Sequence, residues 1–526
     1  MQIVISGGDL TTHRQRKFFA RPPWQECLVI SLLVCGPLSR GFVTGYNSSS
    51  STYFQHDVPL LTSSTAVSLY SSFVYVGGII SALVFGVTMD SLGRRATIFF
   101  SAFPLYVGWM LLVAADSAAL LLCGRLFSGI GCSVVFSALG VYIAEVAHES
   151  TRGGWTILSE LLISVGSTAA FALSDWMPVR WMAVVGAAMA VVQATLLLGV
   201  PESPRWLVEH GRPAEARRNL AWVRGVGGGR RTTADDESTS AVDEELATIR
   251  RKLDETSSTT DARRVHGFCG RFAVLWTVRN RLRISVPMVS FQGLCGHVGI
   301  VAFMNTVLAD IGDYPASVAI IVGVARCAAT LVASVCVERC GRKKLFVYGG
   351  AAQAVCLLLV AGAFLLREKL PTAAADDDDP AAAGWRLLTT VERTISLVAI
   401  IVFMMAYSFG WGAVPGVINS EMFPQSVRGT ATCLNTIVGL TAGVVCSYAF
   451  LPMIVHLGTG GAFGTFGAVC AAGTLFGAVA IKETKGLTLE QITEMFNEDR
   501  TKLFPRGGGY LDLDRKSTRL NSSHRL

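Results

Sequence analysis

The sequence predicts an all-α membrane protein of twelve transmembrane helices in two pseudosymmetric six-helix bundles. Its composition is 51% hydrophobic and only 16% charged, with a mean hydropathy of +0.47. A helix that spans a bilayer needs about 20 mainly apolar residues. Windows that meet this need occupy residues 28–46, 66–89, 97–115, 119–140, 155–175, 181–200, 284–308, 315–337, 345–366, 395–418, 430–455 and 461–481.

A repeated pair of charged cassettes is the second observation behind this fold class. The first copy is Gly86…Asp90…Gly93-Arg94-Arg95, followed by Glu145 and by Arg152-Gly153. The second copy is Glu338…Gly341-Arg342-Lys343, followed by Glu421 and by Arg428-Gly429. Two halves with the same charged loops are most simply two related bundles around a central path, an arrangement that favours transport.

The apolar windows divide the chain into five parts. They are an N-terminal cytoplasmic segment (1–27), a first bundle (28–200), a cytoplasmic loop with short helices (201–283), a second bundle (284–481) and a cytoplasmic tail (482–526). Within the loop, 225–240 is glycine-rich and acidic and is predicted to be a flexible linker. The last dozen residues show no relation to the rest and are assigned no function.

The distribution of charge fixes the expected orientation. The formal net charge is +7, and the arginines and lysines gather at the chain start, in the cassettes and in the central loop. With an even number of helices these all fall on one side, which the positive-inside rule makes the cytoplasm. This pattern indicates a multi-pass protein, most simply of the plasma membrane, with both termini cytoplasmic, and not a nucleic-acid partner. Asn47-Ser48-Ser49 is a candidate glycosylation acceptor in the first outside loop.

The cassette charges are candidates for a cytoplasmic gate. Glycines allow tight turns between helices, and arginine forks pair with carboxylates on neighbouring helix ends. Such pairs at the bundle interface would hold the cytoplasmic side shut and break when it opens. The alternative is that they only set topology. The candidates are Asp90, Arg94, Arg95, Glu145, Arg152, Glu338, Arg342, Glu421 and Arg428.

These motifs together resemble the sugar porter family of the major facilitator superfamily, closest in character to facilitated trehalose and glucose transporters. Besides the cassettes, the resemblance rests on Gly124-Arg125…Gly129-Ile-Gly131, Tyr142, Pro201-Glu202-Ser203-Pro204-Arg205, Pro424 and Glu483-Thr-Lys-Gly486. It implies the major facilitator fold, a substrate site near the midplane and alternating access by rocking of the two halves. It implies no nucleotide hydrolysis. An enzyme is not expected, because no nucleophile–base pair or metal-ligand set stands out in the sequence, and no cofactor or metal is expected. The protein is expected to work as a monomer on a sugar or similar polar solute.

The resemblance is weaker at the expected substrate positions. On helix 7, Gln292 and Gly296 match the family pattern, whereas Gly293 replaces its second glutamine. On helix 10, Gly416 stands where the family has tryptophan, and Trp411 lies about one turn away. Gln292 is the best single contact predicted here, because an amide both donates to and accepts from hydroxyls. Pro415 is expected to bend or loosen helix 10.

Three further changes add charge. By counting from the cassettes, Glu160 and Arg326 fall at amide positions of the family pattern, and Arg40 replaces an apolar residue. An ionisable group at mid-membrane costs several kcal/mol unless it is paired or hydrated, so each is a functional-site candidate. We expect Glu160 to pair with Arg40 or Arg326 inside the central cavity. The alternative is a static buried pair.

The mode of transport is expected to be facilitated diffusion. Proton-coupled sugar porters carry a carboxylate on helix 1, and the matching position is interpreted here as Val43. His297 on helix 7 is interpreted as a helix-packing donor. Glu160 leaves proton symport open. The sequence is also compatible with an organic-ion transporter and with a non-transporting sugar sensor that keeps the cassettes while its pocket drifts.

Overall fold

We describe the fold from a computed structural model of the 526-residue chain. The structure describes residues 24–56, 60–148, 152–226, 233–260, 278–312, 314, 317–369, 380–423 and 425–483. Most of the predicted N-terminal segment, part of the predicted linker, the acidic run 376–379 and the tail after 483 lie outside these residues. Within them, every regular element is a helix and there is no strand.

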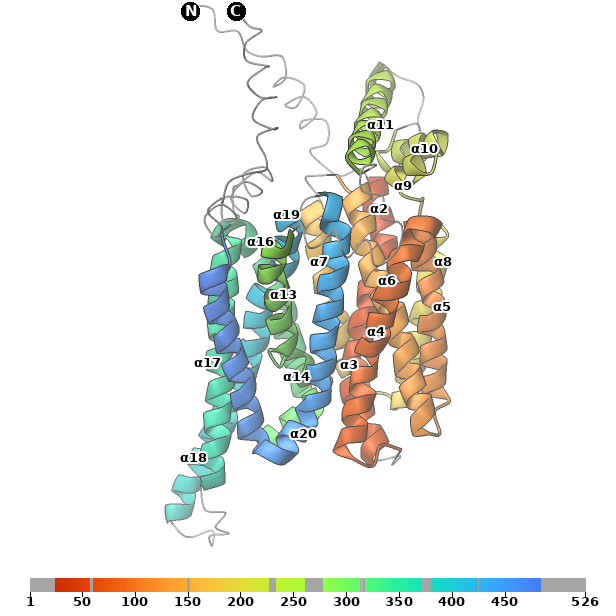
Figure 1. The fold of residues 1–526 in the computed structure, drawn as a ribbon. Helices are drawn as coiled ribbons and strands as arrows, with labels where there is room; N and C mark the ends of the chain where they lie inside the picture. The colour runs from red at the N-terminus through yellow and green to blue at the C-terminus, as the bar shows by residue number, and fades with distance from the viewer. Residues whose placement is uncertain are drawn as a thin grey trace, which may run out of the picture.

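The first half of the chain forms one bundle (Figure 1). Its helices are α2 (Trp24–Leu33), α3 (Cys35–His56), α4 (Ser64–Leu92), α5 (Arg94–Val113), α6 (Ala118–Val146), α7 (Arg152–Ser174) and α8 (Val179–Leu197). Ser63 and Ser117 cap α4 and α6 by accepting hydrogen bonds from the backbone N–H groups of Ala66 and Leu120. The long apolar helices follow the predicted windows, and the short loops between them place consecutive helices antiparallel.

Three helices between the halves project from one end of the molecule (Figure 1). They are α9 (Pro204–Glu209), α10 (Pro213–Val223) and α11 (Thr233–Thr260). Trp206 and Leu207 of α9 and Ala216 of α10 form a small buried cluster of their own. This end is the predicted cytoplasmic end.

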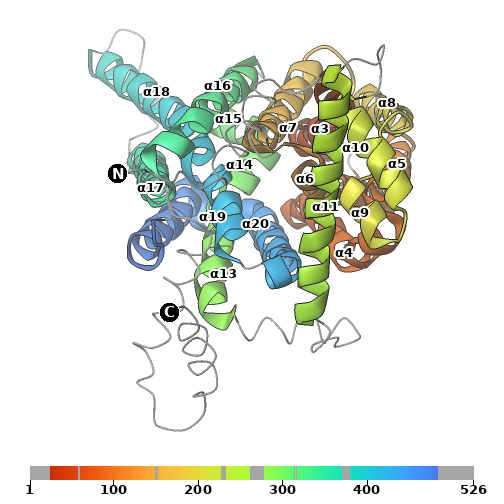
Figure 2. The same ribbon diagram turned by 90° about the horizontal axis from the view of Figure 1, so that it is seen from above.

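The second half forms the other bundle. Its helices are α13 (Arg279–Leu294), α14 (His297–Ala302), α15 (Met304–Gly312), α16 (Ser317–Cys340), α17 (Arg342–Lys369), α18 (Pro380–Tyr407), η3 (Ser408–Gly412), α19 (Val414–Met422) and α20 (Gln425–Ala480). Helix α20 contains two predicted spans, because the chain breaks helical geometry and turns at Gly458 (φ 71°). Seen from the predicted cytoplasmic end, the two halves lie side by side (Figure 2).

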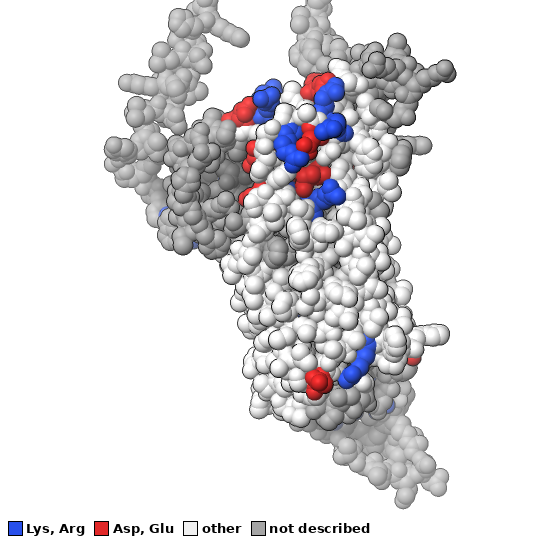
Figure 3. All heavy atoms as spheres, turned by 90° about the vertical axis from the view of Figure 1, so that its right-hand side faces the viewer, with Lys and Arg blue, Asp and Glu red and all other residues white. Residues whose placement is uncertain are grey.

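Every predicted window falls on described helices, although some windows hold two or three helices and α20 holds two windows, and the helices differ in apolar character. Eight of the described helices are long and apolar enough to cross a membrane, or nine if the bent pair α15 and α16 is one span. Helix α3 falls short because the polar run Asn47–Ser51 lies inside it, and α20 counts once although it holds two spans. The surface agrees with a membrane belt: charges gather at both ends of the visible face, with an uncharged band between them (Figure 3).

Close backbone contact joins α3 to α7, which positions the candidate site. A side chain at Gly41 would collide with the carbonyl oxygen of Ile163, and one at Gly166 would collide with that of Leu38. Glycine lets the two backbones touch. On its other side α7 packs against α16 of the second half, where the Thr168 hydroxyl and the Cys327 sulfur lie 3.8 Å apart.

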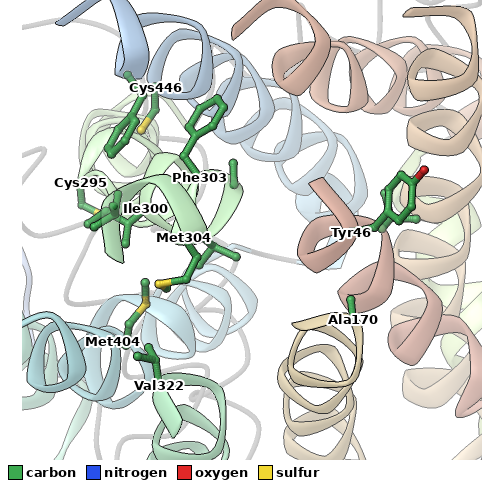
Figure 4. Packing of buried hydrophobic residues seen from close by; sticks show 14 of the residues in the cluster. Tyr46, Ala170, Cys295, Ile300, Phe303, Met304, Val322, Met404 and Cys446 are labelled. Atoms are coloured by element: carbon green, nitrogen blue, oxygen red, sulfur yellow. The ribbon is translucent and has the colours of Figure 1, made fainter. Parts of the chain in front are cut away.

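A buried hydrophobic cluster extends through both halves. Figure 4 shows Tyr46 and Ala170 from the first half and Phe303, Met304 and Met404 from the second. The stacked rings of Phe303 and Phe450, with centroids 5.6 Å apart, tie α20 to the segment between α14 and α15. Helix 7 of the sequence analysis comprises α13, α14 and α15, and its outer part, α14 and α15, also packs against α3.

Candidate functional site

A polar cluster lies where α3, α7 and α16 meet. Arg40 precedes the Gly41 contact on α3, Glu160 lies one turn before Ile163 on α7, and Arg326 precedes Cys327 on α16. The charges of Arg40 and Arg326 both act on Glu160. The structure therefore brings together three charges that are far apart in the sequence and come from both halves. We call these residues, with Tyr75, Gln292 and Tyr407, the central polar cluster.

The cluster lies inside the molecule without being fully buried. Glu160, Arg326, Tyr75 and Tyr407 are each surrounded by protein, yet each keeps some solvent-accessible surface. Intramembrane charges are tolerated where they face the interior of a bundle or a water-filled cavity, and the position of these groups fits that setting. No direct ion pair joins Glu160 to either arginine among the described residues. The guanidinium of Arg40 instead lies over the Phe136 ring, 3.9 Å from its centroid.

Two tyrosines complete the cluster and were missed by the sequence reasoning. Tyr75 of α4 is within electrostatic range of Arg40 and Arg326, and Tyr407 of α18 is within range of Arg326 and Glu160. The His297 ring stacks almost parallel on the Tyr407 ring, with centroids 3.6 Å apart, and its Nε2 is buried without a hydrogen-bond partner among the described residues. A tyrosine in the middle of an apolar window is the signal that could have found them.

Gln292 lies beside Tyr407. Its side chain lies close to the Tyr407 hydroxyl, and its Nε2 donates to the Gly412 carbonyl at 3.4 Å. Gly412 ends a π-helical turn (Ser408–Gly412), and a new helix begins at Val414 with Pro415 in its first turn. Helix 10 of the sequence analysis comprises the end of α18, η3 and α19. The predicted break in it is therefore present, and it begins before the proline.

Trp411 does not belong to the cluster, and its prediction as a substrate contact is wrong for this structure. Its side chain is fully buried, and its indole N–H donates to the Phe346 carbonyl at 3.0 Å. The ring stacks on Phe346 and fills the space opposite Gly350 and Gly473. Trp411 was predicted as a contact because it lies about one turn from Gly416. It stands within the π-helical turn, which changes the direction in which its side chain points.

Asn47 is likewise not a glycosylation acceptor on an outside loop. It lies within α3, is 4% exposed, and accepts a hydrogen bond from Arg125 of α6. Arg125 is fully buried and also donates to the Val43 carbonyl at 3.1 Å. The Asn47 side chain therefore faces the buried arginine, whereas Val43 contacts it through its backbone carbonyl. No carboxylate contacts Arg125 among the described residues.

The two halves are hydrogen-bonded to each other at the outer ends of α3 and helix 7. Asn47 Nδ2 donates to the Ala302 carbonyl at 2.9 Å, and the Asn305 backbone N–H donates to the Ser48 hydroxyl at 2.9 Å. Both bonds cross between the halves. They close the side opposite to α9–α11.

The first charged cassette ties helix ends together within one half. Arg94 Nη2 donates to Glu145 at 2.8 Å, and the Ser203 hydroxyl donates to the same carboxylate at 2.6 Å. Arg95 donates to the Leu197 and Leu198 carbonyls at the end of α8. Glu202 accepts the backbone N–H groups of Arg94 and Arg95 at 3.0 and 3.2 Å, and so caps α5.

The second cassette repeats this geometry. Arg342 Nη2 donates to Glu421 at 2.9 Å, and Glu483 accepts the Arg342 backbone N–H at 2.9 Å. Gly93 and Gly341, which open the two turns, share the same φ of 93°. A carboxylate from the end of each half thus caps the equivalent helix.

The remaining gate candidates have different outcomes. The Asp90 carbonyl accepts a hydrogen bond from the Trp206 indole at 2.8 Å. The side chains of Arg152, Glu338 and Arg428 lie outside the described residues. Both ion pairs described above lie within a half, so they do not bridge the two halves as the sequence analysis expected.

A buried network joins the predicted cytoplasmic helices to the first bundle. Arg224 at the end of α10 contacts Glu26 of α2 at 3.3 Å and Glu245 of α11 at 2.7 Å, and Glu26 is fully buried. The Trp155 indole of α7 also donates to Glu26 at 3.3 Å. These contacts anchor α10 and α11 to α2 and α7.

Two related helical halves, an accessible polar cluster between them and charged turns at one end define a membrane transporter. The sequence matches the family described as "Sugar (and other) transporter" over residues 29–496, and the chain belongs to that family. Such proteins are transporters, not enzymes. This establishes the predicted major facilitator architecture, a multi-pass membrane protein and a small-molecule substrate.

Individual relatives cover most of the chain. "Sugar transporter ERD6-like 17" of Arabidopsis thaliana is 28% identical over 468 residues, which are 89% of this chain and 91% of that protein. "Facilitated trehalose transporter Tret1" of Drosophila virilis is 28% identical over 483 residues, and the match covers 89% of this chain but 48% of that protein.

The fold is similar to that of solved transporters. The proton:xylose symporter XylE bound to 6-bromo-6-deoxy-D-glucose superposes with a TM-score of 0.69 at 20% identity, over 90% of this chain and 99% of that one. A partially occluded inward-open conformation of XylE from E. coli gives a TM-score of 0.70, over 89% of this chain and all of that one.

Proposed function

We propose that the chain moves a sugar or a closely related hydroxylated solute across a membrane, most simply the plasma membrane, by facilitated diffusion. The observation that carries this proposal is the central polar cluster. Its side chains come from α3, α4 and α7 of one half and from α13, α16 and α18 of the other. A solute held between them is exposed to one side or the other when the halves rock.

The amide and hydroxyl groups of the cluster suit a hydroxylated solute. Gln292 offers a donor and an acceptor, and Tyr75 and Tyr407 offer hydroxyls. The relatives named as sugar and trehalose transporters support the same class of cargo, hexose or disaccharide.

The outer hydrogen bonds between Asn47 and Ala302 and between Ser48 and Asn305 form the outer gate in this proposal. While they hold, the cluster communicates with the side that carries α9–α11. The cassette ion pairs keep each half rigid, and opening outward requires the outer bonds and the apolar packing of α14 and α15 against α3 to separate. Positive charge at that end supports cytoplasmic termini.

The hydrogen-bond partners of the buried Arg125 favour uniport over proton symport. Arg125 is held by the Asn47 amide, the Val43 carbonyl and the Ser50 hydroxyl, none of which titrates near neutral pH. Glu160 remains the one carboxylate of the central polar cluster.

Uptake of radiolabelled glucose and trehalose into proteoliposomes, with and without a pH gradient, tests the proposal. Saturable uptake that follows the solute gradient and ignores the pH gradient is expected. Accumulation driven by an imposed pH gradient would make the protein a symporter. Binding without uptake would make it a sensor.

A further inference from the structure

The central polar cluster holds more positive than negative charge. Arg40 and Arg326 contribute two positive charges, and Glu160 contributes one negative charge. Glu160 is the one carboxylate that acts on Arg326 among the described residues, and the same two arginines are the charges that act on Glu160. With all three groups ionised, the cluster has one unbalanced positive charge.

Within the described ranges, none of the three charged groups is satisfied by a direct partner of opposite charge. The Nε of Arg326 is buried without a hydrogen-bond acceptor. Arg40 rests on the Phe136 ring, and no hydrogen bond or ion pair is described for the Glu160 carboxylate. Arg94 and Arg342, in contrast, each have a carboxylate within 2.9 Å. Unpaired charge in a bundle is costly, so these groups point to a ligand that completes them.

We propose that the preferred substrate is a hydroxylated monoanion, a sugar carboxylate such as a hexuronate, and not a neutral sugar. The inference rests on the proposed transport function. The substrate carboxylate would lie on the forked guanidinium of Arg326, a geometry that gives two parallel hydrogen bonds. The substrate hydroxyls would donate to Glu160 and bond Gln292 and Tyr407.

A carboxylate matches the cluster better than the other anion that sugars commonly carry. A phosphate monoester holds about −1.5 to −2 charges at neutral pH, which exceeds the single unbalanced charge of the cluster. A sugar carboxylate holds one negative charge and leaves the occupied site neutral. A neutral sugar would leave the positive charge unbalanced.

Uptake of radiolabelled glucuronate, compared with glucose, into proteoliposomes that contain the full chain tests the proposal. Glucuronate is expected to enter saturably and to compete with glucose at lower concentration. Uniport of a monoanion moves charge, so an imposed inside-positive potential of about 100 mV should raise the final accumulation of glucuronate by about 50-fold. The accumulation of glucose should not respond.

Substitutions of the cluster arginines test which residue gives the preference for glucuronate. Arg326→Gln should reduce the preference for glucuronate over glucose by at least about tenfold, the value of one lost charged contact. Arg326→Lys keeps the charge but loses the fork, so it should reduce the preference by less than Arg326→Gln does. Arg339→Gln is the matched control, because Arg339 is exposed near the end of the same helix. If Arg326→Gln does not fold, Arg40→Gln gives the second measurement, with monodispersity in detergent as the check.

The outcomes separate the two proposals. Uptake of glucose without uptake of, or competition by, glucuronate overturns the inference and leaves the proposed function standing. Glucuronate uptake that Arg326→Gln leaves unchanged also overturns it. Uptake of neither solute by folded protein contradicts the proposed function itself.

Discussion

Arg94 at the start of α5 and Glu145 at the end of α6 form an ion pair of 2.8 Å, with each side chain 8% exposed. The pair joins two helix ends of one half, and Arg342 and Glu421 repeat it in the other half at 2.9 Å. Because both pairs lie within a half, they preserve the shape of each bundle while the bundles move relative to each other.

Breaking the pair should destabilise the protein more than it alters solute recognition. Arg94→Gln leaves Glu145 nearly buried without its cation, which should cost about 3 kcal/mol and lower the melting temperature in detergent. Glu145→Gln should do the same, and the double variant should cost less than the sum of the two. Arg212→Gln is the control, because its pair with Glu215 is exposed and should contribute about 0.5 kcal/mol. Equal effects of Arg94→Gln and Arg212→Gln would contradict the prediction.

The two cassette glycines should tolerate no side chain. Gly93 and Gly341 have φ of 93°, and a Cβ would lie 2.5 Å from a Glu202 oxygen and 2.6 Å from a Glu483 oxygen. Gly93→Ala or Gly341→Ala should therefore cost about 2 kcal/mol in backbone strain and also weaken the helix cap. Gly362→Ala is the control, since its helical position has open space and should gain up to about 1 kcal/mol. Thermal melts of the purified variants measure the difference.

Asn47→Asp should make transport depend on pH. The new carboxylate would face the buried Arg125, and only its protonated form could still donate to the Ala302 carbonyl as Asn47 does. Protonation would then favour the closed outer contact and deprotonation its opening. Because the cycle needs both, the uptake rate should pass through a maximum with pH in this variant. The rates of the native protein and of Asn47→Gln should not show that maximum, and a flat profile for Asn47→Asp would contradict the role given to Asn47.

The contact between α10 and α11 should be insensitive to pH in the neutral range. Arg217 donates two hydrogen bonds to Asp243, at 2.6 and 2.9 Å, and these bonds lower the pKa of the Asp243 carboxyl. A carboxyl with a lowered pKa stabilises the fold at pH values above its ordinary pKa. This contribution is lost as the pH falls through the lowered pKa.

Hydrogen exchange of α11 measures this contact. The difference between the native protein and Arg217→Gln, compared at equal pH, should stay constant from about pH 5 to 8. It should diminish only in stronger acid. A difference that changes near neutral pH would assign the effect to another group.

Several features could be predicted from local pattern. The windows predicted the spans because a bilayer requires long apolar helices, and each window falls on one to three described helices or on one arm of α20. The two glycine turns could also be predicted, because tight turns need glycine. Glu202 and Glu483 were recognised as motif members, but their capping role was not, because each is more than 100 residues from the N–H it accepts.

The errors have a common cause. The Asn47 triplet was placed on a loop because the run of serines after it is polar, yet α3 continues to His56 and buries those serines against α4 and α6. Trp411 was placed by helical spacing, and the π-helical turn altered that spacing. The positions of Asn47 and Trp411 both depend on contacts with segments that are distant in the sequence.

The sequence by itself determined the helices, the two related halves and the side on which positive charge gathers, because apolar length, glycine turns and charge bias act locally along the chain. Only the tertiary structure decided which polar groups meet. Arg40, Glu160 and Arg326 converge because α7 packs between α3 and α16, and Arg125 meets an amide because of the rotation of α3. Side-chain direction and helix packing follow from contacts between distant segments, so the pattern of one segment cannot specify them.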